Sequence, residues 1–272
     1  MEGKVWEMST SVRLQAVLFD WAGTTVDFGS RAPAQVFVEI FRRRGVDITA
    51  AEAREPMGRA KREHIAAVLG MPRVAAEWQR VHGRAATDAD VTAMYEDFLP
   101  LQKSVLAEGS DVIAGVPAAV AWLRQRNIRV GSTTGYTREL MSVVAPLAAG
   151  QGYVPDVIVC SDEVSAGRPA PWLNLRAAAE LRTDSAANVL VVDDTAVGIE
   201  AGRAAGMTTV AVSLTGNALG LSHQEVCALP AVELTQRLAK IEQEFRAAGA
   251  DYVITSVAEL PELLRGQPFL LA

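Results

Sequence analysis

Six short apolar segments limit the folds that this chain of 272 residues can adopt. Each has the length expected of a strand buried on both faces, and each of the first five leads into a stretch with helical periodicity. They are residues 14–20, 128–134, 156–160, 188–194, 208–213 and 251–256. Strands that alternate with helices form a parallel sheet covered on both faces. The pattern therefore predicts an α/β fold with a Rossmann-like, doubly wound parallel sheet.

The alternation is interrupted after the first segment, because residues 30–106 show helical patterns and no strand pattern. Residues 33–44 have an apolar face, and a Thr-Ala-Ala-Glu capping box at 49–52 starts a second helix. A helical block inserted between the first two strands predicts a cap domain on an α/β core. We expect a core of residues 1–28 and 108–272 and a cap of residues 29–107, with linkers near Phe28–Pro33 and Glu108–Val116.

Charge and hydropathy argue against several classes of partner. The formal net charge of −6 argues against binding to nucleic acid or to an anionic membrane surface. No apolar run is long enough for a transmembrane helix, and the first 15 residues lack the apolar segment of a secretory signal. Cys160 and Cys227 have no CxxC spacing, which leaves one disulfide open and argues against a zinc site. We expect a cytoplasmic protein.

Polar residues follow four of the predicted strands, where ligands of such sheets bind. Asp20 ends the first strand; it either caps a turn or acts as a nucleophilic carboxylate that forms an acyl-phosphate. Gly23 in the loop after it would let backbone N–H groups approach a phosphoryl oxygen. Thr134, with Thr133 beside it, offers a hydroxyl for the same group, and Arg168 offers a guanidinium, unless that side chain is simply solvated.

Asp193 and Asp194 end a later apolar strand. Adjacent buried carboxylates repel each other unless a cation lies between them and Asp20. Carboxylates, a backbone carbonyl and water suit octahedral Mg²⁺, whereas the alternative is a turn with Thr195 as helix N-cap. The presence of Asp20 favours the metal site.

The order of these groups resembles the haloacid dehalogenase (HAD) superfamily of aspartyl-nucleophile hydrolases, and the helical insert matches its cap. The resemblance implies a HAD-fold core. In the phosphatases of that superfamily a second aspartate stands two positions after the nucleophile and protonates the leaving alcohol, but here the residue is Ala22. Three explanations are an inactive protein, a dehalogenase, and a leaving group that needs no such proton. The acidic pair argues against a metal-independent dehalogenase.

A basic segment of the cap supports the third explanation. Lys61 lies one turn inside a predicted helix, and His64 follows on the same face. A desolvated lysine near other cations, here Arg59 and Arg62, can have a lowered pKa and form a Schiff base with an aldehyde. The segment taken alone is better explained as a solvated basic helix face.

Together the motifs D-W-A-G-T-T, P-M-G-x-x-K and G-S-T-T-G-Y-T resemble the phosphonatase branch of the superfamily, over residues 14–263. The resemblance implies hydrolysis of the P–C bond of phosphonoacetaldehyde in 2-aminoethylphosphonate degradation by a homodimer, which we expect to pair through helices such as 33–44. It further implies these roles: Asp20 as nucleophile, Lys61 as Schiff base, His64 in proton transfer, Met57 in the pocket lining, Thr134 and Arg168 on the phosphoryl group, and Asp20, Asp194 and the Ala22 carbonyl on Mg²⁺.

Gly198 departs from the superfamily pattern, in which many members carry an aspartate four residues after the metal acid. The departure bears on metal affinity, and Asp193 is a candidate for second-sphere support. Two alternatives to the phosphonatase remain: a phosphatase or phosphomutase acting on a phosphate ester, and a non-catalytic binding protein of the same fold.

Overall fold

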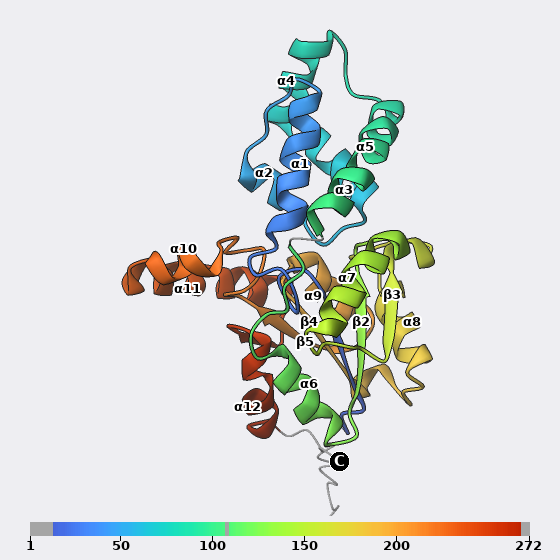
Figure 1. Cartoon of the computed structure of the whole chain (residues 1–272), viewed down its shortest axis with the longest axis vertical. Coiled ribbons are helices and arrows are strands. Elements are labelled where there is room, and N and C mark those ends of the chain that lie inside the picture. Colours follow the sequence, from blue (N-terminus) through green and yellow to red (C-terminus); the bar gives the residue numbers. More distant parts are fainter. Residues whose placement is uncertain (1–12, 107–108, 268–272) are drawn as a thin grey trace, which may run out of the picture.

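The computed structural model describes residues 13–106 and 109–267. Within them a six-stranded, wholly parallel sheet has the order β3-β2-β1-β4-β5-β6, as Figure 1 shows in part. The strands are β1 (Ala16–Phe19), β2 (Arg129–Thr134), β3 (Val157–Cys160), β4 (Val189–Asp193), β5 (Thr208–Val212) and β6 (Tyr252–Ile254). The predicted α/β fold class is confirmed. Residues 1–12, most of the segment searched for a secretory signal, lie outside the described residues.

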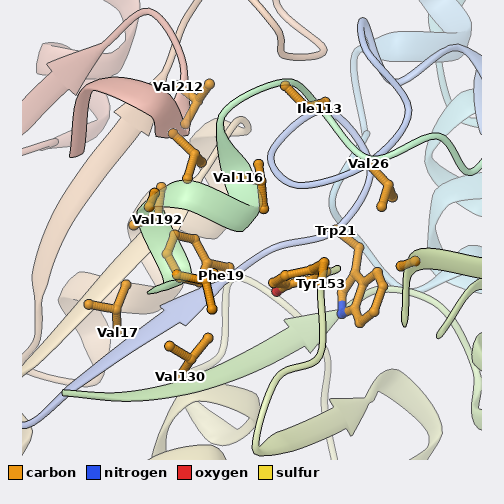
Figure 2. Packing of buried hydrophobic residues seen from close by; sticks show 14 of the residues in the cluster. Val17, Phe19, Trp21, Val26, Ile113, Val116, Val130, Tyr153, Val192 and Val212 are labelled. Carbon is orange, nitrogen blue, oxygen red and sulfur yellow. The ribbon is translucent and has the colours of Figure 1, made fainter. Parts of the chain in front are cut away.

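Successive side chains of the central strand β1 point to opposite faces of the sheet, as the pleat requires. Val17 and Phe19 belong to an apolar cluster that also contains residues of α6 (Val116–Arg124), α7 (Arg138–Gly150) and α12 (Leu260–Arg265), and Figure 2 shows part of this cluster. Ala16 and Leu18 pack on the other face, under α8 (Trp172–Glu180). Both faces are therefore covered, which explains why the strands read as continuous apolar runs.

The same second face is covered further along the sheet. There α9 (Ala196–Ala204) and α11 (Ala231–Ala248) pack over β5, and α10 (His223–Ala228) lies between β5 and α11 in the chain, after a loop. Phe19 is in register with Ser132 of β2 and with Val192 of β4. Asp20 therefore leaves the sheet between the ends of β2 and β4, where the strand order reverses and where such sheets bind ligands.

Five helices between β1 and the core helix α6 form the predicted insert, above the sheet in Figure 1. They are α1 (Arg31–Arg43), α2 (Ala50–Arg54), α3 (Lys61–Leu69), α4 (Pro72–His82) and α5 (Asp88–Leu106). Thr49 and Glu52 form the predicted capping box of α2. A separate apolar cluster, drawn only from residues 34–98 with partners to 105, supports the proposed cap. Its proposed end at residue 107, and the first residue of the linker from 108, lie outside the described residues.

The apolar face of α1 is covered within this chain. Phe37 and Phe41 are fully buried, and Val36 and Ile40 nearly so, in the apolar cluster of the cap. The expectation that helix 33–44 offers its apolar face to a partner subunit is therefore wrong, because α5 packs against it and His64 of α3 stacks on Phe37. A homodimer remains a prediction without an assigned surface.

Two further expectations concern cysteines and membranes. Cys160 is a buried free thiol at the end of β3 and Cys227 is an exposed free thiol in α10, so the disulfide left open by the sequence does not form. No helix in the described parts of the chain is long and apolar enough to cross a bilayer.

Candidate active site

The loop after β1 is held by its own backbone and by one aromatic side chain. The carbonyl of Trp21 accepts hydrogen bonds from the N–H groups of residues 24, 25 and 26. Trp21 Nε1 donates to Ser132 Oγ at 2.9 Å, and the indole meets the Tyr153 ring edge-on at 5.1 Å. This tight turn fixes the backbone that presents Asp20 at the edge of the sheet.

Arg168 contacts residues at three of the strand ends that the sequence predicted to converge. Its guanidinium, 2% exposed, donates to Asp20 Oδ1 at 2.6 Å and lies 3.2 Å from Asp193 Oδ2. Its other terminal nitrogen donates to the carbonyl and hydroxyl oxygens of Thr133. The two adjacent threonines therefore have different surroundings, because Thr133 holds Arg168 while Thr134 lines the cavity.

Asp193 and Asp194, although adjacent in the chain, have different contacts. Asp193 Oδ1 accepts hydrogen bonds from the backbone N–H and the hydroxyl of Thr195, and its carboxylate fills the space beside Gly198. A Cβ at Gly198 would lie 2.0 Å from Asp193 Cγ, which explains why this chain has no side chain there. Asp194 instead points toward the loop that follows Asp20.

Gly23 has a structural function beside the predicted one. Its own N–H donates to the carbonyl of Val26, so a phosphoryl group would have to be bound by other N–H groups of the loop, and the predicted substrate contact stays a prediction. With φ at +89° and a virtual Cβ only 2.1 Å from Asp194 Oδ2, position 23 admits the Asp194 carboxylate. The sequence correctly indicated that another group approaches the backbone closely at position 23, and the group that does so in the structure is the Asp194 carboxylate.

Burial makes the charged carboxylates of this site costly. It raises the pKa of Asp20 to about 7 although the Arg168 guanidinium opposes the shift, and it raises the pKa of Asp194 well above its ordinary value, together with the charges of Asp20 and Asp193. A divalent cation would remove this penalty. Residues 13–106 and 109–267 contain no group of three or more His, Cys, Asp or Glu side chains placed to bind a metal, so two carboxylates, the Ala22 carbonyl and water would have to suffice.

Lys61 enters the site from the cap as the first residue of α3, not one turn inside the helix as predicted. It is 4% exposed, and its Nζ lies 4.9 Å from the centroid of the Tyr136 ring and 5.5 Å from that of Phe37. Burial lowers the pKa of Lys61 to about 8; the Asp20 charge opposes this and the Arg168 charge adds to it. The expected effect of Arg62 is wrong, because that side chain turns to solvent and pairs with Asp88.

The segment before Lys61 meets the core through glycines at close range. Gly58 has a φ of +93°, and a Cβ there would lie 2.5 Å from Thr195 Oγ1. A Cβ on Gly135 would lie 2.9 Å from the carbonyl oxygen of Arg59. The glycines of P-M-G and T-T-G therefore allow the backbones of cap and core to approach each other closely enough to bury Lys61.

His64 lies behind Lys61, outside the cavity lining, stacked on Phe37 with ring centroids 3.6 Å apart. Because the Ala53 carbonyl can only accept, His64 Nε2 must carry the proton of their 2.9 Å hydrogen bond, which leaves Nδ1 unprotonated. Nδ1 has no hydrogen-bond partner among the residues that the structure describes. Burial, with the nearby Lys61 charge, lowers the pKa of His64 well below its ordinary value, so the imidazole is neutral.

Most of the predicted groups line one small cavity between cap and core, with a volume of about 20 Å³. Core and cap both contribute predicted residues: Asp20, Ala22, Met57, Lys61, Thr134, Arg168 and Asp194. Tyr136 was not among the predicted residues; it is 3% exposed, lines the cavity and faces Lys61. Its place two residues after Thr134, at the end of β2, was the signal that could have identified it.

Over most of its length the chain is similar in sequence to a family of hydrolases and to two proteins that share one name. A sequence model of the haloacid dehalogenase-like hydrolase family matches residues 14–206. A protein of Paraburkholderia xenovorans named phosphonoacetaldehyde hydrolase is 49% identical, covering 91% of this chain and 92% of its own. One of Bacillus cytotoxicus with the same name is 46% identical, covering 93% and 96%.

A solved structure is similar as well. The crystal structure of a phosphonoacetaldehyde hydrolase-like protein from Oleispira antarctica superposes with a TM-score of 0.92 at 40% identity, covering 94% of this chain and 93% of that one. The similarity extends over cap and core together.

Proposed function

Because this chain belongs to the haloacid dehalogenase-like hydrolases and, among them, to the phosphonoacetaldehyde hydrolase family, we propose that it cleaves the P–C bond of phosphonoacetaldehyde by two covalent steps, one on Lys61 and one on Asp20. The observation that carries the proposal is a buried amine facing a buried carboxylate across a single small cavity. An enzyme that only hydrolysed phosphate esters would have no use for that amine.

The amine of Lys61 acts first. With a pKa of about 8, about a tenth of Lys61 is neutral at pH 7, compared with about 0.03% for a lysine of ordinary pKa. The neutral amine adds to the aldehyde carbon, and the carbonyl oxygen leaves as water, which gives an iminium. His64 Nδ1, unprotonated and close behind Lys61, is our candidate for accepting and returning the protons of this step.

The carboxylate of Asp20 then attacks phosphorus in line. The P–C bond breaks, its electron pair neutralises the iminium to an enamine, and phosphorus is bound to Asp20 as an acyl-phosphate. Arg168 and the Thr134 hydroxyl bind the phosphoryl oxygens. One water releases phosphate from Asp20, and protonation of the enamine carbon followed by a second water releases acetaldehyde from Lys61. The net reaction consumes one water.

Asp20, Asp194 and the carbonyl of Ala22 would hold Mg²⁺, which supplies positive charge next to the phosphoryl group when bound. Support comes from the raised pKa values of the two carboxylates, which a cation would bring down. We also propose a role in 2-aminoethylphosphonate degradation, since removal of the amine by transamination leaves this aldehyde, and the predicted cytoplasmic homodimer stands as part of the same proposal.

The test measures acetaldehyde and phosphate from phosphonoacetaldehyde, with and without Mg²⁺. We expect equal amounts of the two products, and borohydride added with substrate should attach a two-carbon adduct to Lys61, located by mass spectrometry. Lys61→Arg keeps the charge and removes the nucleophile, so it should abolish both signals. Undiminished turnover by Lys61→Arg refutes the proposal, and turnover of phosphate monoesters alone would favour an ester phosphatase.

A further inference from the structure

Arg54 is the last residue of α2, and it extends from the cap into the core. Its Nη1 donates to the carbonyl oxygens of Gly29 and Ser30, in the linker, and to Asn217 Oδ1 at 3.1 Å. Its Nη2 donates to the Gly220 carbonyl at 3.1 Å. One partly buried guanidinium therefore joins three segments: the cap helix, the linker after the first strand, and the core loop 213–222.

The contact between Arg54 and Asn217 runs in both directions. While the guanidinium donates to the side-chain oxygen of Asn217, Asn217 Nδ2 donates back to the Arg54 carbonyl at 3.2 Å. Gly220, with φ at +66°, gives the guanidinium its space, because a Cβ there would lie 2.8 Å from Arg54 Cζ. The loop is thus shaped to receive this one side chain.

The same loop holds the candidate site. The N–H of Asn217 donates to Asp194 Oδ2 at 2.7 Å, and a Cβ at Gly216 would lie 2.6 Å from Asp194 Cβ. Thr215 Oγ1 donates to the carbonyl of Gly23 in the loop after Asp20. The Thr215 carbonyl accepts the N–H of Gly29 in the linker. Any displacement of this loop would therefore move Asp194 and the linker together.

We propose that Arg54, with Asn217 and the carbonyls of Gly29, Ser30 and Gly220, forms a cap latch: it keeps the cap docked, so that Lys61 enters the cavity at the same time as the loop fixes Asp194. Arg54 is then a positioning residue for the proposed reaction, on which this inference rests. It touches no reacting atom. Its effect passes through docking of the cap and through Asn217.

Arginine suits this role better than lysine. The planar guanidinium offers five N–H donors in fixed directions and satisfies four acceptors here, whereas an ammonium reaches fewer of them. In Arg54→Ala the four acceptors would depend on water, which favours the undocked cap. A cap arginine that does not reach the core provides a matched control: Arg73 pairs with Glu52 and the Asp47 carbonyl, all within the cap.

Exposure of Lys61 measures docking without any turnover. Lys61 is 4% exposed, while the side chains of Lys103 and Lys240 are 46% and 79% exposed and serve as internal references. We would treat the full-length protein with trinitrobenzenesulfonate and quantify labelling of each lysine by mass spectrometry. Arg54→Ala should raise the ratio of Lys61 to Lys103 labelling about tenfold, as expected for loss of hydrogen bonds to a charged group. The labelling ratio of Arg54→Lys should lie between those of the wild type and Arg54→Ala, and the ratio of Arg73→Ala should match that of the wild type.

Turnover of phosphonoacetaldehyde supplies the second measurement. Arg54→Ala should lower kcat and raise KM, with partial recovery in Arg54→Lys. Asn217→Ala, which leaves the backbone acceptors of Arg54 in place, should shift both measurements in the same direction and serves if Arg54→Ala does not fold. An unchanged Lys61 labelling ratio in folded Arg54→Ala or Asn217→Ala overturns the latch, even where turnover falls. If no variant and no wild type hydrolyses the phosphonate, the proposed function fails while the labelling ratio still decides on the latch.

Discussion

The buried amine of Lys61 should make the folded chain less stable than it would be with an uncharged side chain of similar shape. Its pKa falls from 10.5 in the unfolded chain to about 8 in the folded one, chiefly through burial. The difference, at 1.36 kcal/mol for each unit of pKa, corresponds to about 3 kcal/mol. Below pH 8 both states hold the proton and the folded state bears this full cost. Between pH 8 and 10.5 the unfolded state binds more protons, so stability rises with pH, and above 10.5 the cost is absent.

Lys61→Met keeps the aliphatic stem and removes the charge. We expect the free energy of unfolding at pH 7 to increase by about 3 kcal/mol, and the advantage to shrink to about 1 kcal/mol at pH 9.5. Urea unfolding of the wild type and Lys61→Met at the two pH values, without added metal, measures this difference in the free energy of unfolding. Lys103→Met is the control, because that lysine is half exposed on the surface and should change stability little at either pH. A Lys61→Met variant that is no more stable than the wild type at pH 7 would refute the assignment of a buried, charge-destabilised amine.

Three further predictions follow from the same contacts. If neutral Lys61 is the nucleophile, kcat/KM for phosphonoacetaldehyde should rise with pH, reach half its maximum near pH 8 and level off above it; a flat profile from about pH 6 to 8 would contradict this. Ala22→Asp adds a carboxylate to the cavity, which favours the charged amine, so acetaldehyde release at pH 7 should fall by about tenfold, and an unchanged rate would count against the argument. Gly198→Ala pushes a methyl group into the Asp193 carboxylate and should lower the free energy of unfolding by about 1–3 kcal/mol, measured in urea; a neutral effect would show that the carboxylate has room to move.

The sheet and the cap were predictable because their signals are local. A buried parallel strand is a short apolar run, and the polar residue that ends it, such as Asp20 or Asp193, marks the edge where ligands bind. The convergence of Asp20 and Asp193 follows from the pairing of β1 with β4, since the ends of neighbouring parallel strands meet, whereas Arg168 reaches them from the loop before α8. The capping box at Thr49 is likewise a short-range pattern, and the structure contains it as predicted.

What the sequence did not reveal depends on contacts between distant segments. The sequence predicted a lowered pKa of Lys61 from desolvation together with Arg59 and Arg62; burial is indeed the main cause, but the cation that contributes is Arg168, which is distant in the chain. No local pattern gives the distance between Gly58 and Thr195 that permits this burial. The absence of a side chain at Gly198 looked like a lost metal acid, yet the carboxylate of Asp193, five residues earlier, occupies that space.

Ala22 and Lys61 lie in the lining of the same cavity, one from the core and one from the cap, and their chemistry is linked. In a phosphate ester the departing oxygen needs a proton, which an acid at position 22 would supply. In the proposed reaction on a phosphonate the departing atom is carbon, and the iminium on Lys61 would take up its electron pair, so no acid would be required there. An acid at position 22 would also raise the pKa of Lys61 and leave less neutral amine to form the iminium. The missing acid and the buried amine are therefore two parts of one requirement: a cavity that keeps its nucleophilic nitrogen uncharged.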